Sequence, residues 1–119
     1  MTAIGDVVRG DVVEVNLDPT VGTEIKKTRP CVVVQNDIGN KYSRRTIIVP
    51  ATGAEHIVKP FAIHVAVPAG EGGLTKASVM LCDQIRAVDK SRLVRTLGRL
   101  SSSTIKKLDA ALKISLALK

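Results

Sequence analysis

Short β-branched runs separated by turn-forming residues constrain this chain more than any other feature of its sequence. Residues 12–17 alternate with the two-residue period typical of a half-buried strand, with Val13, Val15 and Leu17 set against Val12, Glu14 and Asn16. Asp18-Pro19 then predicts a turn, and Pro30 to Val34 predict a second strand. The charged loop between them is therefore expected at the end of the two strands that it connects.

The rest of the chain continues the same pattern. Further strands are expected at residues 46–49, closed by Pro50, at residues 61–67, at residues 78–82 and 85–88, and at residues 93–100. In the strand at 61–67 we expect Phe61, Ile63, Val65 and Val67 to point inward and His64 to face the other way, as a partly exposed structural histidine. Residues 36–41 are predicted to form a turn cluster.

The C-terminal segment changes to a helical period. Ser101, Ser102 and Ser103 are capping candidates for a helix whose apolar positions are Ile105, Leu108, Leu112 and Leu116. We find no internal repeat or linker, so residues 1–119 are expected to form one domain. Many short strands and one terminal helix predict a mainly β fold with appended helices, a small β-barrel with a C-terminal α-helix.

The composition narrows the possible partners. The formal charge is +7, from 18 Lys and Arg against 11 Asp and Glu, and such a chain attracts polyanions. Tyr42 and Phe61 are the only aromatic residues, too few for a surface that stacks successive bases. Any contact with nucleic acid must therefore use phosphate contacts, hydrogen bonds to base edges and loop shape.

The two cysteines, Cys31 and Cys82, lie singly in apolar runs and predict buried free thiols in a reducing compartment. They do not form a short-spaced ligand pair with each other or with His56 and His64, so no metal site is predicted. The sequence also lacks a signal peptide and a membrane-spanning segment, which favours a cytoplasmic protein that does not interact with membranes.

A series of short motifs follows along nearly the whole chain. These are Arg9-Gly10-Asp11, Asp18-Pro19-Thr20-Val21-Gly22-Thr23-Glu24, Thr28-Arg29-Pro30, Gln35-Asn36-Asp37, Val49-Pro50-Ala51-Thr52, Cys82-Asp83-Gln84-Ile85-Arg86 and Leu97-Gly98-Arg99-Leu100. In order and spacing they resemble the MazF/PemK/Kid family of toxin endoribonucleases. The resemblance implies an SH3-like barrel of the MazF/PemK/CcdB type, and a chemistry in which the ribose 2′-OH attacks the adjacent phosphorus without a metal or cofactor.

The resemblance also implies catalytic residues. Arg29, in Thr-Arg-Pro, would stabilise the charge of the phosphorane, Thr52 would help to hold the scissile phosphate, and Glu24 would act as the base or orient the arginine. A fixed donor aimed at developing charge is typically worth about 2.7 to 4 kcal/mol. On pattern alone, Arg29 could equally be a solubilising strand-edge residue, Thr52 a turn residue and Glu24 an exposed loop carboxylate.

Asp83 and Gln84 interrupt an apolar region, and the resemblance places them where RNA is recognised. Family members that use this Asp as a general base carry an Arg two residues before it, whereas this chain has Leu81 there. Recognition of the RNA sequence is therefore the expected role of Asp83 as well as Gln84. Lys26, Lys27 and Arg86, with the Arg44-Arg45 corner, are expected to contact phosphates.

Three functions are consistent with these residues. The first is a sequence-specific endoribonuclease toxin that cleaves single-stranded mRNA, acts as a homodimer and is neutralised by a cognate antitoxin with an acidic tail. The second is a non-enzymatic CcdB-type toxin that poisons a protein such as gyrase, which would not require Glu24, Arg29 and Thr52. The third is a nucleic-acid-binding barrel that has lost its activity.

Overall fold

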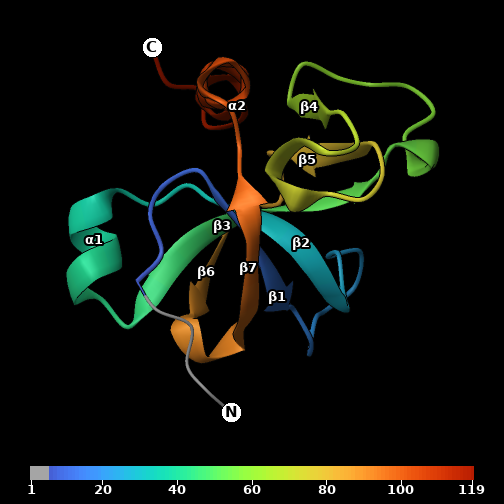
Figure 1. The fold of residues 1–119 in the computed structure, drawn as a ribbon. Coiled ribbons are helices and arrows are strands. Elements are labelled where there is room, and N and C mark those ends of the chain that lie inside the picture. The colour runs from blue at the N-terminus through green and yellow to red at the C-terminus, as the bar shows by residue number, and fades with distance from the viewer. Residues whose placement is uncertain (1–5) are drawn as a thin grey trace.

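The structure is a computed structural model, and residues 6–119 of it are described. These residues form a curved sheet of antiparallel strands with two α-helices and three short 3₁₀ turns (Figure 1). The strands are β1 (Asp11–Asn16), β2 (Thr28–Val33), β3 (Arg45–Gly53), β4 (His64–Val67), β5 (Ser78–Leu81), β6 (Arg86–Asp89) and β7 (Leu93–Arg99). The helices are α1 (Asp37–Tyr42) and α2 (Ser102–Ser115), and the 3₁₀ turns are η1 (Ala54–His56), η2 (Glu71–Gly73) and η3 (Lys90–Arg92).

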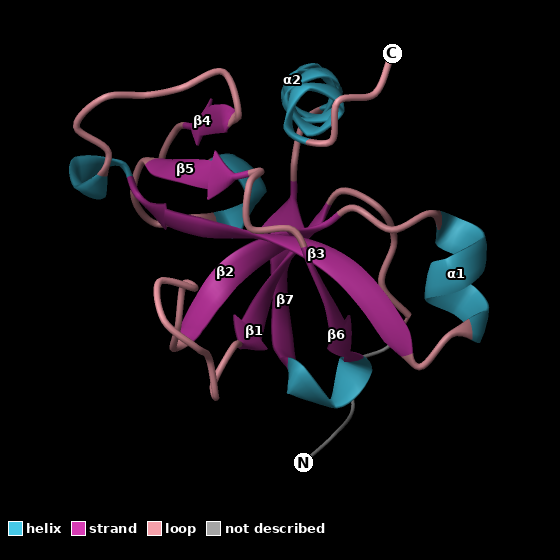
Figure 2. Ribbon diagram, turned by 180° about the vertical axis from the view of Figure 1, so that it is seen from behind, coloured by secondary structure: helices cyan, strands magenta, loops and turns pink. Residues whose placement is uncertain are grey.

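The strand order confirms the predicted fold class. The sheet runs β4-β5-β3-β2-β1-β7, with β6 also paired to β3, and α2 follows the last strand. Seen from behind, β1, β2, β3, β6 and β7 fan out together, while β4 and β5 form a separate wing (Figure 2). The sheet curves strongly, but within residues 6–119 its two end strands do not pair with each other to close a barrel.

Strand β3 links these two parts. Its first half pairs with β6 from Arg45 to Ile48, and its ladder with β2 ends at the pair Cys31–Pro50. From Ala51 to Gly53 it pairs with β5. The prediction that Pro50 closes the strand is therefore wrong. Pro50 lies where β3 changes partners, a position at which a missing N–H interrupts no continuous ladder.

Two hydrophobic clusters lie on opposite sides of the central strands. The adjacent residues Val12 and Val13 are both fully buried, and each belongs to a different cluster. The first cluster includes Leu108 and Ala111 of α2 together with residues of β3, β4 and β5. The second includes Val15, Leu17 and Cys31. The expected alternation of β1 is confirmed: Val13, Val15 and Leu17 are buried, whereas on the other face Val12 is buried, Glu14 is half-buried and Asn16 is exposed.

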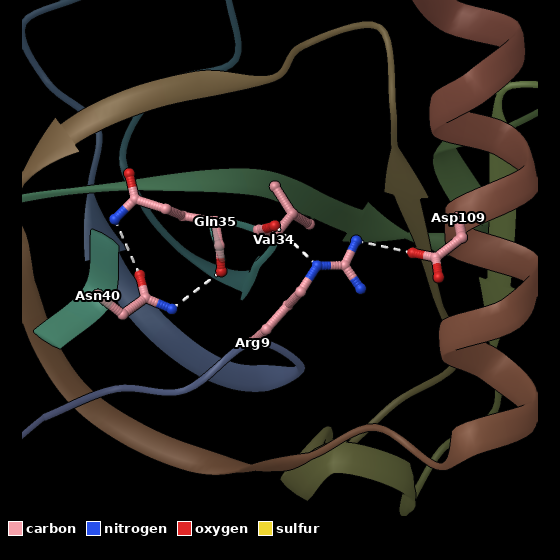
Figure 3. Close-up of polar contacts among 5 residues, drawn as sticks. All are labelled: Arg9, Val34, Gln35, Asn40 and Asp109. Carbon is pink, nitrogen blue, oxygen red and sulfur yellow. Dashed lines mark hydrogen bonds and ion pairs between the residues drawn. The ribbon is translucent and has the colours of Figure 1, made fainter. Parts of the chain in front are cut away.

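Helix α2 is fixed to the sheet by its cap and by one arginine. The Ser101 hydroxyl accepts a hydrogen bond from the Thr104 N–H, which confirms the expected capping. Figure 3 shows Arg9 reaching across to α2, where Nη2 lies 2.7 Å from Asp109 Oδ1 and Nε donates to the carbonyl of Val34 at 2.8 Å. Arg9 thus links the segment before β1 to the end of β2 and to α2.

Residues 36–41 are not the predicted turn cluster, because residues 37–42 form helix α1. The Asn36 side chain accepts from the Gly39 N–H and caps the helix. Asn40 is buried, and its amide pairs with Gln35 (Figure 3) and accepts from the Thr46 hydroxyl. These contacts with residues outside the segment stabilise a helix that its own composition does not indicate.

The predicted strand at 61–67 is shorter than expected, since β4 begins only at His64. Val65 and Val67 are buried as predicted, but Phe61 is 64% exposed. Phe61 precedes the strand, and its N–H donates to Nδ1 of the partly exposed His64. Cys31 and Cys82 are buried and free, as predicted. Over residues 6–119, no helix has the length and apolar character needed to cross a membrane.

Candidate active site

The loop between β1 and β2 is held at its base by backbone contacts. Leu17 N–H donates to the Lys27 carbonyl at 3.1 Å, and the Lys27 N–H donates to the Asp18 carboxylate at 3.2 Å. Lys27 has a φ of 76°, in the left-handed region that side chains other than glycine rarely adopt. This closed base fixes the point at which the chain enters β2, two residues before Arg29.

Arg29 projects from the first residues of β2. Its backbone pairs with Val15 of β1, and its Nε donates to the Lys26 carbonyl at 2.7 Å. Within residues 6–119 its two terminal nitrogens have no hydrogen-bond partner, so they remain available to a ligand. The guanidinium is thus positioned through one nitrogen while its paired donors stay free.

Thr52 lies on the neighbouring strand near Arg29. The β2–β3 ladder ends at Cys31–Pro50, and continuing the same register by two residues would bring Arg29 opposite Thr52. Thr52 instead pairs with Val79 of β5; it is half-buried and lines the same cavity as Arg29. The structure therefore brings these two predicted residues together.

This first cavity has a volume of about 340 Å³ and is rich in cations. Besides Arg29 and Thr52, the predicted phosphate contact Lys27 lines it. Sequence reasoning missed several other polar lining residues, namely Glu14, His56, Lys76 and Arg95. Glu14 and Arg95 face each other across β1 and β7, with N–O distances of 3.2 and 3.3 Å, a pairing that becomes visible only when the strand order is known.

Four of the other predicted residues, Glu24, Asp83, Gln84 and Arg86, line a second cavity of about 360 Å³. The two cavities share no lining residue; both are lined by β3, the second by Pro50 and the first by the next residue, Ala51. The Glu24 carboxylate accepts a hydrogen bond from Val21 N–H within its own loop at 2.7 Å. Glu24 and Arg29 therefore do not share a cavity.

Gln84 and Arg86 both bond to the β1–β2 loop. Gln84 Oε1 accepts from the Ile25 N–H at 2.7 Å, and Arg86 Nη1 donates to the Leu17 carbonyl at 2.8 Å. Asp83, on the tight turn between β5 and β6, is exposed. Lys26 is exposed and lines neither cavity, although its carbonyl holds Arg29.

Burial raises the pKa of the Cys31 thiol to about 12, although the charges of Arg29 and Arg86 act in the opposite direction. Cys31 is therefore a neutral packing residue beside two site arginines, and no nucleophile. In residues 6–119, no group of three or more His, Cys, Asp or Glu side chains is arranged to hold a metal ion.

Comparison with known proteins gives consistent matches. Residues 8–116 match the family model described as PemK-like, MazF-like toxin of type II toxin-antitoxin system. Endoribonuclease EndoA of Bacillus subtilis is 44% identical over 110 residues, which cover 92% of this chain and 94% of that protein.

Solved structures of lower identity share the fold. MazF from Deinococcus radiodurans superposes with a TM-score of 0.82 at 23% identity, covering 97% of this chain and all of that one (100%). An endoribonuclease from a mycobacterial species, solved in complex with its cognate antitoxin, has a TM-score of 0.77 at 23% identity, with 95% and 97% covered.

Proposed function

The chain belongs to the family of PemK-like, MazF-like toxins of type II toxin-antitoxin systems, and we propose that it is a sequence-specific endoribonuclease that cleaves single-stranded RNA without a metal ion. The 44% identity to an endoribonuclease over nearly the whole chain supports the activity. The observation that carries the proposal is the cavity shared by Arg29 and Thr52.

In this proposal the scissile phosphate binds in the first cavity. The free terminal nitrogens of Arg29 donate two parallel hydrogen bonds to its non-bridging oxygens, and these bonds strengthen as the phosphorane gains negative charge. The Thr52 hydroxyl donates to the same phosphate. Lys27, Lys76 and Arg95, which line the cavity, attract the RNA backbone.

Glu24 and Asp83 line the second cavity, and in this proposal they supply the carboxylates of the site. We assign to Glu24 the removal of the 2′-OH proton from a strand that passes between the two cavities. Asp83 and the amide N–H₂ of Gln84 contact base edges in this proposal. The oxygen of the 2′-OH then attacks phosphorus, and the products carry a 2′,3′-cyclic phosphate and a 5′-OH.

An antitoxin with an acidic tail is the proposed inhibitor. A mycobacterial relative is described in complex with its cognate antitoxin, and a chain of charge +7 attracts acidic segments. Such a tail would compete with RNA for the cations of the first cavity. We further propose that the protein acts in the cytoplasm as a homodimer, for which the exposed apolar residues Phe61, Ile114 and Leu118 offer contact area.

Incubation with a long single-stranded RNA in EDTA tests the function. We expect wild type to cut RNA at a small set of sites, to leave the corresponding DNA intact, and to generate 2′,3′-cyclic phosphate ends. Arg29→Ala should lower the single-turnover rate by about 10²- to 10³-fold, as loss of a preorganised donor does in other enzymes. Arg29→Lys should recover little, because an ammonium cannot make the paired contact.

An exposed cation outside both cavities and outside the expected phosphate contacts provides the control: Lys106→Ala, on α2, should retain the wild-type rate. Intact RNA with wild type would refute the enzymatic function and favour a toxin that acts on a protein. Cleavage that stops in EDTA would refute the mechanism.

A further inference from the structure

The proposed reaction requires a group that the predicted residues do not supply. When the P–O5′ bond breaks, the departing oxygen needs a proton, because an alkoxide is a poor leaving group in water. Arginine stays protonated in proteins and cannot donate its proton. Histidine is the residue type whose ordinary pKa lies close to neutral pH and which most often performs such transfers. His56 lines the cavity that contains Arg29 and Thr52.

The fold brings His56 back to this cavity by a short turn. Thr52 and Gly53 end β3, and η1 then covers Ala54–His56. The Ala54 N–H donates to the Ala77 carbonyl at 3.0 Å, and the Ile57 N–H donates to the Ala54 carbonyl at 3.1 Å. Both ends of the turn are therefore fixed, and the histidine is held four residues after Thr52 at the rim of the same cavity.

A carboxylate accompanies the imidazole ring. Glu55 Oε1 lies 3.3 Å from His56 Nε2 and 2.8 Å from Lys76 Nζ. The hydrogen bond from Lys76 holds the pKa of Glu55 below its usual value, so this carboxylate is ionised at neutral pH. The carboxylate therefore lies on the Nε2 side of the ring, and within residues 6–119 Nδ1 has no hydrogen-bond partner. The side chain of His56 is 64% exposed, which leaves room for a substrate.

We infer that His56 is the general acid of this endoribonuclease. The inference rests on the proposed function and adds a residue to it. The 2′-oxygen bonds to phosphorus as its proton passes to the carboxylate assigned above, Glu24. The P–O5′ bond breaks as the proton of the His56 imidazolium passes to the 5′-oxygen. The products are a 2′,3′-cyclic phosphate, a 5′-OH, a protonated Glu24 and a neutral imidazole. Glu24 then gives its proton to water and the imidazole takes one from water, which restores the enzyme.

A change of leaving group tests this role. A cleavage site of the wild-type enzyme is first mapped on a long RNA, and a short oligonucleotide containing that site is made with oxygen or with sulfur as the bridging 5′ atom. A thiolate leaves without protonation far more readily, since thiols have a pKa near 8.5. We expect His56→Gln to cut the oxygen substrate about 10²- to 10⁴-fold more slowly than wild type and the sulfur substrate at nearly the wild-type rate.

The other histidine provides a matched control. His64 accepts the Phe61 N–H through Nδ1 and lines neither site cavity, so His64→Gln should cut both substrates like wild type. Thermal unfolding should show that both variants are folded. A His56→Gln variant as fast as wild type on oxygen, or equally slow on oxygen and sulfur, would overturn the assignment while the proposed function stands. A wild-type protein that cuts no RNA would overturn both.

Discussion

The side-chain oxygen of Gln84 accepts a hydrogen bond from the backbone N–H of Ile25 at 2.7 Å. This contact joins the turn between β5 and β6 to the loop that leads into Arg29. The Gln84 oxygen is therefore engaged within the protein, and within residues 6–119 its N–H₂ group has no hydrogen-bond partner. In the proposed function, this one side chain both positions the loop and recognises a base.

Two substitutions of Gln84 should separate these roles. Gln84→Met removes the acceptor at nearly constant volume, and we expect the free energy of unfolding to fall by about 0.5 to 1.5 kcal/mol. Gln84→Glu keeps an acceptor for Ile25 but loses the N–H₂ donor, so stability should stay within about 0.5 kcal/mol of wild type while the pattern of RNA cleavage sites changes. Urea denaturation and mapping of cut sites measure the two effects. Equal stability of the two variants would contradict the loop contact.

Lys27 offers a test of backbone strain beside the site. Its φ of 76° costs about 1 to 2 kcal/mol for a residue with a Cβ, whereas glycine adopts it freely. Lys27→Gly and Lys27→Ala both remove the cationic side chain from the first cavity, but only glycine relieves the strain. We expect Lys27→Gly to be more stable than Lys27→Ala by about 1 kcal/mol, and both to bind RNA more weakly. Thermal unfolding and filter binding at one fixed salt concentration check this pair.

The buried thiol of Cys31 predicts a pH dependence of stability. Its pKa rises from the ordinary value of 9.0 to about 12 on folding, mainly because burial removes the thiol from water. Between these values the unfolded chain loses the proton and the folded protein keeps it, so unfolding becomes more favourable as the pH rises. The contribution of the neutral Cys31 thiol to the free energy of unfolding is fully present below pH 9. It is lost as the pH rises toward 12, by at most about 1.4 kcal/mol per pH unit.

Other groups titrate in the same range, so the comparison must be with a variant. Cys31→Val fills the site without an ionisable group, and its free energy of unfolding should fall less steeply than that of wild type above pH 9. Parallel curves for the two proteins would show that the thiol does not titrate differently on folding.

Much of the fold is predictable because its strands carry local patterns. The alternation in β1, the β-branched run of β2 and the apolar spacing of α2 each depend on residues close in sequence. Helix α1 was missed because its stability depends on partners elsewhere, through the buried Asn40 and its contact with Thr46. The continuation of β3 past Pro50 likewise depends on β5, which lies more than twenty residues further along the chain.

The candidate site, like the fold, is only partly predictable from local sequence patterns. Motifs single out Arg29, Thr52 and Glu24, but they do not show that the first two share a cavity and the third lies in the other one. That arrangement follows from the β2–β3 register and from the loop bonds to Gln84 and Arg86. His56 carries no motif signal, and only the 3₁₀ turn after Thr52 brings it to the cavity.

Strand β3 contributes Ile48 to one hydrophobic cluster and Val49 to the other, so consecutive side chains of one segment belong to both halves of the interior. If one cluster lost its packing, β3 would move and the other cluster would lose its contacts with β3 as well. The molecule should therefore melt in a single cooperative step, and Thr52, at the far end of the same segment, keeps its place until that step occurs.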